Sequence, residues 1–324
     1  NVASDKIILT GVGKTKNEIR LGLEKKVLMI KAECEEEVEL INKIAGEMNV
    51  VASVALRVNP DVDAKTHPYI STGLSKNKFG IDSSEALSIY RGRNKYKNIL
   101  FTGIDMHIGS QITSIEPFVE AIQKLSDIYF TLKTEGLTLK HFDVGGGIGV
   151  QYNNEKSFTI EEFAQKTIPH LKKLGCKILF EPGRYLTANG GILLTEVLYN
   201  KSNGDKKFII IDAAMNDLLR PTIYQAYHHI QPIKKEIDRT DIVADIVGPV
   251  CETGDYFARD RKISETKSGE FLAIMSAGAY AMTMASNYNA RRRAPEIIID
   301  GEKVITARSR ETFEHLLWDE NLYL

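Results

Sequence analysis

The chain of 324 residues is 43% hydrophobic and 26% charged, and its formal net charge is −1. This is an ordinary globular composition, and the balanced charge gives no bulk attraction to nucleic acid or to membranes. We see no signal peptide and no apolar run near the ~18 residues of a membrane span. The three cysteines, Cys34, Cys176 and Cys251, are widely spaced and form no CxxC motif. We therefore expect no disulfide framework and no metal site, and a cytoplasmic, reducing location fits best.

Six short apolar runs predict β-strands in the first part of the chain. They lie at residues 6–13, 25–32, 51–60, 99–110, 140–147 and 176–184. Each run is nearly continuous rather than alternating in polarity, which is typical of strands buried on both faces of a parallel sheet.

Amphipathic helices are predicted between these strands, with apolar residues at helical spacing in residues 33–48, 118–132 and 163–174. Strands that alternate with helices indicate βαβ units. Because no GxGxxG motif opens a helix at the expected place, we favour a (β/α)8 TIM-type barrel, of which about six of the eight units are countable. We expect either an open sheet or two further units upstream of Asn1, since a partial barrel exposes sheet edges and should not be stable alone.

The sequence pattern changes after about Thr187. Short strands are predicted there, joined by polar turns, and few helices intervene before a final ETFEHLLW segment. This pattern predicts a mostly antiparallel β domain. We expect two domains, a partial barrel at residues 1–187 and a β domain with a terminal helix at residues 188–324.

Polar residues follow three late strands of the predicted barrel, in the segments HIGS, GGG and EPGR. Working residues of such barrels lie at the carboxyl ends of the strands. The consecutive glycines Gly145–Gly147 let backbone N–H groups converge on an anion, so we favour a phosphate cradle over a flexible turn. His107 could stack on an aromatic cofactor and Ser110 could bind its phosphate, although a lone histidine is more often a core residue.

The EPGR segment combines an acid and a base on a Pro-Gly turn. Arg184 can pair with a phosphate or a carboxylate through its planar fork. Glu181, aimed at a heteroaromatic nitrogen, would keep that nitrogen protonated, as an electron-sink cofactor requires. The alternative is an ion pair between Glu181 and Arg184 on the rim of the sheet.

The predicted β domain offers further candidates, each with a plainer alternative. Cys251 could donate a proton, or it could be a small buried core residue. Tyr280 could bind a phosphate, or its ring could lie in the core. Arg220 and Tyr224, in NDLLRPTIY, suit a substrate carboxylate.

Taken together, these segments resemble the fold-type III pyridoxal-phosphate decarboxylases over essentially the whole chain. The matching blocks are TGVGKT, NPDVDAKTHPYISTGLSKNKFGI, HIGSQ, FDVGGGIGV, EPGR, DAAMNDLLRPTIY, GPVCETGD and GAYAMTMASNYN. No single block is decisive, but their occurrence in this order is highly specific.

The resemblance implies pyridoxal 5′-phosphate as cofactor, with Glu181 at the pyridine nitrogen, His107 on the ring and Cys251 as the proton donor after CO₂ leaves. The residues implied to surround the cofactor and its phosphate are Ser110, Gly145, Gly146, Gly147, Gly183, Arg184 and Tyr280. Those implied to bind the substrate are Arg184, Arg220, Tyr224, Glu252 and Tyr280.

The branch that is most similar decarboxylates meso-2,6-diaminopimelate to L-lysine, the last step of lysine biosynthesis, as a homodimer whose active sites are shared between subunits. Two arginines for the substrate favour an acidic distal group. One alternative is a decarboxylase of basic amino acids or carboxynorspermidine.

The second alternative is a non-catalytic homologue, because the family's Schiff-base lysine lies in a YAxKAN-like block that this chain lacks. Lys76 and Lys78 match a different family loop and are not candidates for that lysine.

Overall fold

The computed structural model of the protein describes residues 2–64, 77–234 and 239–320. The chain divides into two compact units. The first unit comprises Asn1–Gly149 and Lys156–Gly183, and the second comprises Val150–Glu155 and Arg184–Leu324. Lys76 and much of the NPDVDAKTHPYISTGLSKNKFGI block lie outside the described residues.

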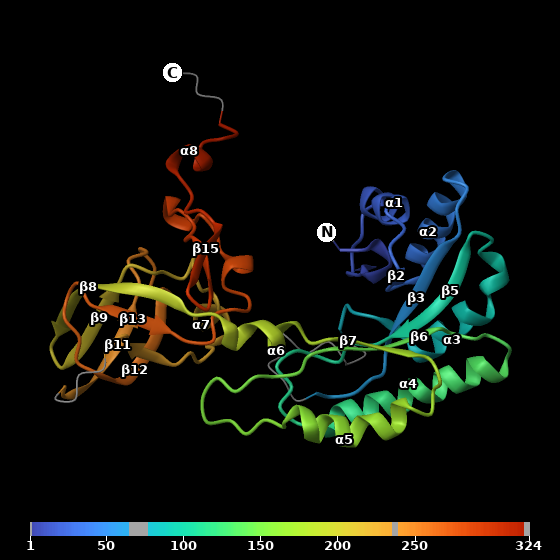
Figure 1. Cartoon of the computed structure of the whole chain (residues 1–324), viewed down its shortest axis with the longest axis horizontal. Coiled ribbons are helices and arrows are strands. Elements are labelled where there is room, and N and C mark those ends of the chain that lie inside the picture. Colours follow the sequence, from blue (N-terminus) through green and yellow to red (C-terminus); the bar gives the residue numbers. More distant parts are fainter. Residues whose placement is uncertain (1, 65–76, 235–238, 321–324) are drawn as a thin grey trace. The chain divides into compact units, whose positions relative to one another are not determined.

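The first unit is built on a parallel sheet in which the six predicted strands are confirmed (Figure 1). The strand order is β1-β2-β3-β5-β6-β7, and every pairing is parallel. The strands are β1 (Ile8–Leu9), β2 (Met29–Ala32), β3 (Ala52–Asn59), β5 (Ile99–Asp105), β6 (His141–Gly146) and β7 (Lys177–Glu181), and the short β4 (Ile81–Asp82) pairs with β3.

Helices follow most of these strands, as the amphipathic pattern predicts. They are α1 (Lys16–Glu24), α2 (Glu35–Glu47), α3 (Ser83–Arg91), α4 (Glu116–Thr134) and α5 (Ile160–Leu171), with short 3-10 turns at Ser4–Lys6 and Arg93–Lys95. Capping boxes start α1 at Thr15 and α5 at Thr159, where each threonine oxygen accepts a backbone N–H and a glutamate bonds back. Figure 1 shows α4 and α5 side by side along the sheet.

The two faces of the parallel sheet differ in chemistry. Strand residues such as Val54, Leu56, Ile104 and Phe142 join the apolar core of the first unit. The alternate positions carry polar and charged side chains instead, because successive residues of a strand point to opposite faces. Both faces are largely buried in β3 and β6, as predicted, but β7 has no buried residue. The expectation of uniformly apolar strands is wrong for one face, which carries the polar and charged side chains.

The second unit contains a six-stranded sheet in the order β10-β13-β8-β9-β11-β12 and a separate β14–β15 hairpin. Its strands are β8 (Leu193–Asn203), β9 (Lys206–Ile211), β10 (Ile230–Pro232), β11 (Asp241–Val247), β12 (Tyr256–Ser264), β13 (Phe271–Ile274), β14 (Glu296–Asp300) and β15 (Lys303–Arg308). The pairings are antiparallel, as predicted, except for the parallel pair of β9 and β11.

Among the described residues of the second unit, the helices are all short. They are α6 (Gly183–Thr187), which begins at the last residue of the first unit, α7 (Arg220–Tyr224), α8 (Phe313–Leu316), and 3-10 turns at Ala188–Gly190, Met282–Met284 and Tyr288–Ala290. The predicted terminal helix is thus a short one, α8.

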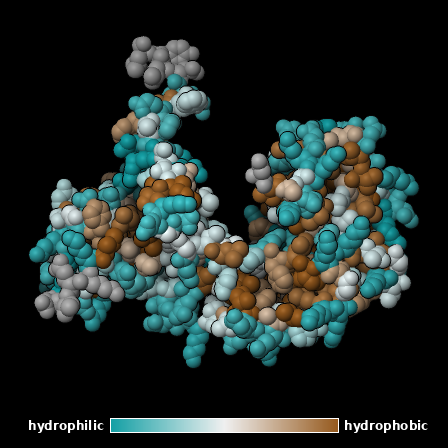
Figure 2. Space-filling view, in the orientation of Figure 1, coloured by the Kyte–Doolittle hydropathy of each residue, from teal (hydrophilic) through white to brown (hydrophobic). Residues whose placement is uncertain are grey.

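Each unit has a core of its own, and both also expose apolar side chains. The second core gathers around Val197, Ile211, Ile246 and Phe257. In Figure 2, hydrophobic residues reach the surface of both units between hydrophilic ones. Among the residues that the structure describes, no helix combines the length and apolar character needed to cross a membrane.

Candidate active site

The carboxyl ends of β5, β6 and β7 meet in the first unit. Gly146, at the end of β6, is the register partner of Glu181, at the end of β7. Its N–H donates a hydrogen bond of 3.0 Å to Nδ1 of His107, which follows β5. The acid, the histidine and the triple-glycine loop therefore form one cluster, as the sequence predicts.

The glycines of this cluster allow the strand ends to approach each other through their backbones. A Cβ atom at Gly145, Gly146 or Gly147 would lie only 2.2, 2.3 or 2.2 Å from the carbonyl oxygens of Met106, Glu181 and Gly109, respectively. Gly145 and Gly147 also have positive φ values of 74° and 98°. Other residues cannot replace them without moving backbone.

The segment that carries Ser110 runs beside the glycine loop. The N–H of Ile112 donates to the carbonyl oxygen of Gly147 at 2.9 Å, and the N–H of Gly149 donates back to that of Ile112 at 3.0 Å. The predicted phosphate residues of HIGS and of the glycine loop are thus neighbours.

His107 is held as a neutral imidazole. Burial, assisted by the positive charge of Arg57, lowers the pKa of His107 to about 4. Because Nδ1 accepts the Gly146 N–H, the proton of the neutral ring lies on Nε2. An uncharged planar ring at this place is suited to stack on an aromatic ligand.

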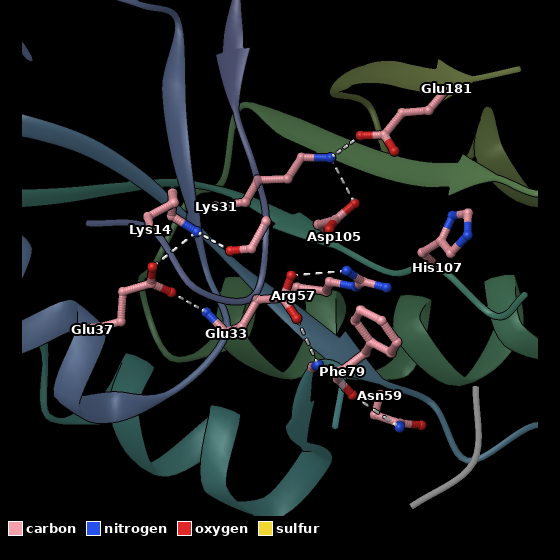
Figure 3. Close-up of polar contacts among 12 residues, drawn as sticks. Lys14, Lys31, Glu33, Glu37, Arg57, Asn59, Phe79, Asp105, His107 and Glu181 are labelled. Atoms are coloured by element: carbon pink, nitrogen blue, oxygen red, sulfur yellow. Dashed lines mark hydrogen bonds and ion pairs between the residues drawn. The ribbon is translucent and has the colours of Figure 1, made fainter. Parts of the chain in front are cut away.

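Arg57 is fixed beside this histidine by a second group of contacts (Figure 3). Its Nη1 donates to Oε1 of Glu33 at 2.8 Å, and its guanidinium lies 5.0 Å from the centre of the Phe79 ring. Oε2 of Glu33 accepts the N–H of Gly80 at 3.0 Å. A buried and paired arginine of this kind supplies a constant positive charge.

Lys31 is a buried residue of this cluster that sequence reasoning missed. Its Nζ lies 2.5 Å from Oε1 of Glu181 and 2.9 Å from Oδ1 of Asp105 (Figure 3). It also lies 2.7 Å from Oδ2 of Asp143. The signal that could have revealed it is a lysine in the centre of the apolar run LMIKA, since an unpaired charge there would be costly.

The cluster around Lys31 holds more acid than base. Burial lowers the pKa of Lys31, but the three carboxylates outweigh burial and leave its pKa above the ordinary value. Burial raises the pKa of Asp105 to about 8, and the pKa of Asp143 is raised by burial as well. One ammonium does not balance the charge of three carboxylates, and burial therefore raises the pKa of both aspartates.

A second group of candidate residues lies in the second unit, around the Tyr152 ring. Arg184 donates from Nη1 to the Tyr152 hydroxyl at 2.8 Å, and the Arg220 guanidinium lies 4.4 Å from the ring centre. Arg184 also lies over the Tyr280 ring, at 4.5 Å. The structure thus brings together three predicted residues, Arg184, Arg220 and Tyr280, and forms a buried cationic group suited to a carboxylate.

His228 supports this group and was not predicted. Its Nε2 lies 2.8 Å from Nη1 of Arg220, and its Nδ1 lies 2.8 Å from the carbonyl oxygen of Met275. A guanidinium only donates and a carbonyl only accepts, so His228 must carry its proton on Nδ1. Burial lowers the pKa of His228 to about 4, which agrees with a neutral ring. The sequence signal was its place in YHHI, shortly after the Arg220 block.

The remaining predicted residues occupy more open positions. Cys251 is exposed, so its alternative interpretation as a buried core cysteine is wrong. Glu252 is also exposed and accepts a 2.7 Å hydrogen bond from the Tyr288 hydroxyl. Tyr224 ends α7, and Gly183 begins α6 with open space where a Cβ would lie.

A sheet of TIM-barrel type whose strand ends join a neutral histidine, a triple-glycine loop and an acid defines a class, the pyridoxal-phosphate enzymes with a barrel domain. Residues 1–188 match the family model described as pyridoxal-dependent decarboxylase, pyridoxal binding domain. The diaminopimelate decarboxylase of Aquifex aeolicus is 45% identical over 317 residues, which cover 98% of this chain and 75% of that protein. The Haemophilus influenzae diaminopimelate decarboxylase is 44% identical, with coverages of 97% and 75%. The chain therefore belongs to the diaminopimelate decarboxylase family of pyridoxal-dependent decarboxylases.

Solved structures agree with this assignment. The crystal structure of Helicobacter pylori diaminopimelate decarboxylase complexed with L-lysine has a TM-score of 0.94 and 40% identity, covering 98% of this chain and 79% of that chain. The lysine decarboxylase of Selenomonas ruminantium has a TM-score of 0.80 at 21% identity, covers 93% of this chain and 76% of that one, and supports the fold alone. The barrel and β-domain architecture expected from the sequence is thus confirmed.

The residues present in the first unit fit pyridoxal phosphate. The Glu181 side chain is 39% exposed, so its carboxylate is accessible to a ring nitrogen although one oxygen is held by Lys31. His107 offers a neutral ring, and the glycine loop offers backbone without side chains.

Proposed function

We propose that this protein catalyses the pyridoxal-phosphate-dependent decarboxylation of meso-2,6-diaminopimelate to L-lysine and CO₂. The observation that carries the proposal is the cluster of Glu181, His107 and Gly146 at three neighbouring strand ends. The relatives named diaminopimelate decarboxylase, and the solved relative complexed with L-lysine, support this reaction rather than that of another decarboxylase branch.

The cofactor would be held by residues of the first unit. The bound pyridinium supplies an acceptor for the electron pair that remains when CO₂ leaves. In this proposal the Glu181 carboxylate keeps the proton on the ring nitrogen, and the neutral His107 ring lies flat against the cofactor. The residues proposed to surround the phosphate are Ser110, Gly145, Gly146, Gly147 and Gly183.

Residues of the second unit would recognise the substrate. We assign the distal carboxylate to Arg184, Arg220 and Tyr224, because the two arginines are buried on one aromatic ring. Glu252 would bind the distal ammonium group, and Tyr280 would lie near the cofactor. Cys251 would return a proton to the substrate carbon, and its exposure leaves the thiol accessible for that role.

We further propose that the protein works in the cytoplasm as a homodimer with shared active sites. The free cysteines Cys34, Cys176 and Cys251 suit a reducing compartment. Exposed Cys251 and Glu252 suit a loop that acts on a partner's site. Sedimentation analysis with and without pyridoxal phosphate tests the assembly.

The reaction is tested by supplying the protein with pyridoxal phosphate and meso-diaminopimelate and measuring CO₂ and L-lysine. We expect Glu181→Gln to lower kcat about 100-fold, the scale of one lost electrostatic contact to the reacting group. Glu47→Gln is the matched control, since Glu47 forms an exposed ion pair with Arg20. Wild-type turnover by Glu181→Gln would contradict the proposed role, and turnover of ornithine or arginine in place of diaminopimelate would favour a sister enzyme.

The substrate assignment is tested by Arg220→Met. Loss of one partner of a buried charge contact costs about 2–5 kcal/mol, so we expect KM for meso-diaminopimelate to rise about 100-fold with a smaller change in kcat. Arg91→Met is the control, because Arg91 pairs with Glu135 at the surface. An unchanged KM would remove Arg220 from the substrate site.

A further inference from the structure

The Lys31 side chain lies on the same face of the sheet as two of its partners, Asp105 and Asp143. In the strand register Lys31 aligns with Ala55, and Ala55 aligns with Gly103. Asp105 follows Gly103 by two residues, and Asp143 is the register partner of Asp105, so both acids lie on this face. The small residues Ala55 and Gly103 leave room for a lysine stem to cross toward the acids.

The hydrogen-bonding capacity of the Lys31 ammonium is fully used. An ammonium has three donors, and Nζ has three carboxylate partners, on Asp105, Asp143 and Glu181. The side chain of Lys31 is fully buried. Oxygen atoms of the three acids lie within 4.8 Å of one another, so Nζ takes the place that a cation would otherwise take among them.

Glu181 differs from the other two acids in its exposure. Its side chain is 39% exposed, whereas those of Asp105 and Asp143 are 3% and 1% exposed. Lys31 holds Oε1, and within the part of the chain that the structure describes Oε2 forms no hydrogen bond. One oxygen is therefore anchored from inside the sheet, and the other can accept a proton donor from a ligand.

We infer that Lys31 is a positioning residue, a built-in cation that orients the Glu181 carboxylate toward the ring nitrogen of the cofactor. This inference rests on the proposed function. It assigns Lys31 a fixed electrostatic role and not that of an amine that reacts with the cofactor aldehyde. A protonated amine that is bound to three carboxylates has no free electron pair for such a reaction.

The test compares the wild-type protein with Lys31→Met, which keeps an unbranched side chain one heavy atom shorter and removes its charge. Each protein is titrated with pyridoxal phosphate that is isotopically labelled at the ring nitrogen, and the protonation of that nitrogen is read by NMR. Without Lys31 the Glu181 carboxylate is no longer held toward the ring nitrogen, so we expect the ring-nitrogen signal to move from the protonated to the unprotonated position. The affinity for pyridoxal phosphate should fall about tenfold, as for one lost charge-assisted hydrogen bond.

Lys14→Met is the matched control. The Lys14 side chain is also nearly fully buried and pairs with one carboxylate, that of Glu37, at 2.9 Å. Its replacement should leave the nitrogen signal and the cofactor affinity unchanged. Lys31→Arg, which restores the charge, should return the signal toward wild type. Lys31→Met/Asp105→Asn removes one acid with the lysine and gives the same readout if the single variant does not fold.

Two results would overturn the inference. One is a protonated ring nitrogen in Lys31→Met at wild-type cofactor affinity. The other is a pyridoxyl label on Lys31 after borohydride treatment of the wild-type protein, read by peptide mass mapping. Absence of any pyridoxal phosphate binding by the wild-type protein would instead overturn the proposed function itself.

Discussion

At the scale of single residues, the protein keeps two histidines neutral by burial. His107 is fixed by the Gly146 N–H, and His228 is fixed between Arg220 and the Met275 carbonyl. Protonation of either ring would place an N–H against a donor, and at His228 it would place a positive charge against Arg220. Both sites therefore depend on histidine as a hydrogen-bond acceptor rather than as a charge.

This dependence predicts acid sensitivity. The pKa of His228 is lowered to about 4 in the folded protein, so between pH 6.5 and 4 the unfolded chain binds more protons and stability falls as pH falls. The loss at the acid end reaches about 3 kcal/mol for one such histidine. His107 acts in the same direction. Asp105 acts in the opposite direction. Its pKa is raised to about 8, so its contribution to the free energy of unfolding falls as the pH rises toward that value.

We expect the free energy of unfolding of His228→Gln to vary less steeply with pH in this range than that of the wild-type protein. Denaturant titrations at several pH values measure the slope. His315→Gln, at an exposed position in α8, is the control. An equal slope for His228→Gln and wild type would show that His228 is not the source of the acid sensitivity.

The sequence allowed some residues of the site to be predicted and not others. His107, Glu181 and the glycines were found because they follow apolar runs at the strand ends. Lys31 and His228 were missed because each lies inside an apolar or mixed segment, where only the partners Asp105, Asp143 and Arg220, distant in sequence, reveal its role. Pairing of buried charges is a tertiary property, and no local pattern encodes it.

At the scale of elements, the close pairing of β6 and β7 at their carboxyl ends depends on glycine. The register of these strands shifts between Asp143 and Gly146, and Gly146 then faces Glu181. The Glu181 carbonyl oxygen occupies the space that a Cβ atom on Gly146 would need. Because Gly146 has no side chain, the two strands can lie this close together, and their distance determines the position of Glu181.

Gly146→Ala should destabilise the protein by about 1–3 kcal/mol, the usual cost of overpacking, because the new methyl group meets backbone rather than a flexible side chain. Gly13→Ala is the control in the same unit, with nothing within 4 Å of the added atom. Its effect should not exceed about 0.5 kcal/mol. Urea unfolding measures both, and equal stabilities for the two variants would contradict the close approach.

The elements themselves were largely predictable. Alternation of apolar strands with amphipathic helices gave all six strands of the parallel sheet, because the hydrophobic period is a local property. The parallel pair of β9 and β11 was not predicted, since the relative direction of two strands depends on the path that the chain takes between them. The charged sheet face was also overlooked, because runs such as VALRVN were interpreted as continuous although they alternate.

At the scale of the whole molecule, two separate cores stabilise the chain. Phe142 belongs to the first core and Phe257 to the second, and both are almost fully buried. Loss of a buried phenylalanine ring costs about 3–5 kcal/mol. Such a loss should act mainly on the core that contains the ring.

Hydrogen exchange measured by mass spectrometry tests this independence. Phe142→Ala should speed exchange in β3 and β6 and leave β9 and β11 near wild type. Phe257→Ala should show the reverse pattern, so each variant is the control for the other. Equal acceleration in both units by either variant would indicate that the two cores unfold together.

The β14–β15 hairpin has a consequence for the behaviour of the protein in concentrated solution. It is a two-stranded sheet, and Ile299 and Val304 on it are 66% and 71% exposed. Open strand edges with aliphatic side chains are sites where copies of a protein adhere, and charges at the turn oppose this by mutual repulsion. Asp300 and Glu302 outnumber Lys303 at the turn and give it a net negative charge, so raising the ionic strength should favour self-association that begins at this hairpin.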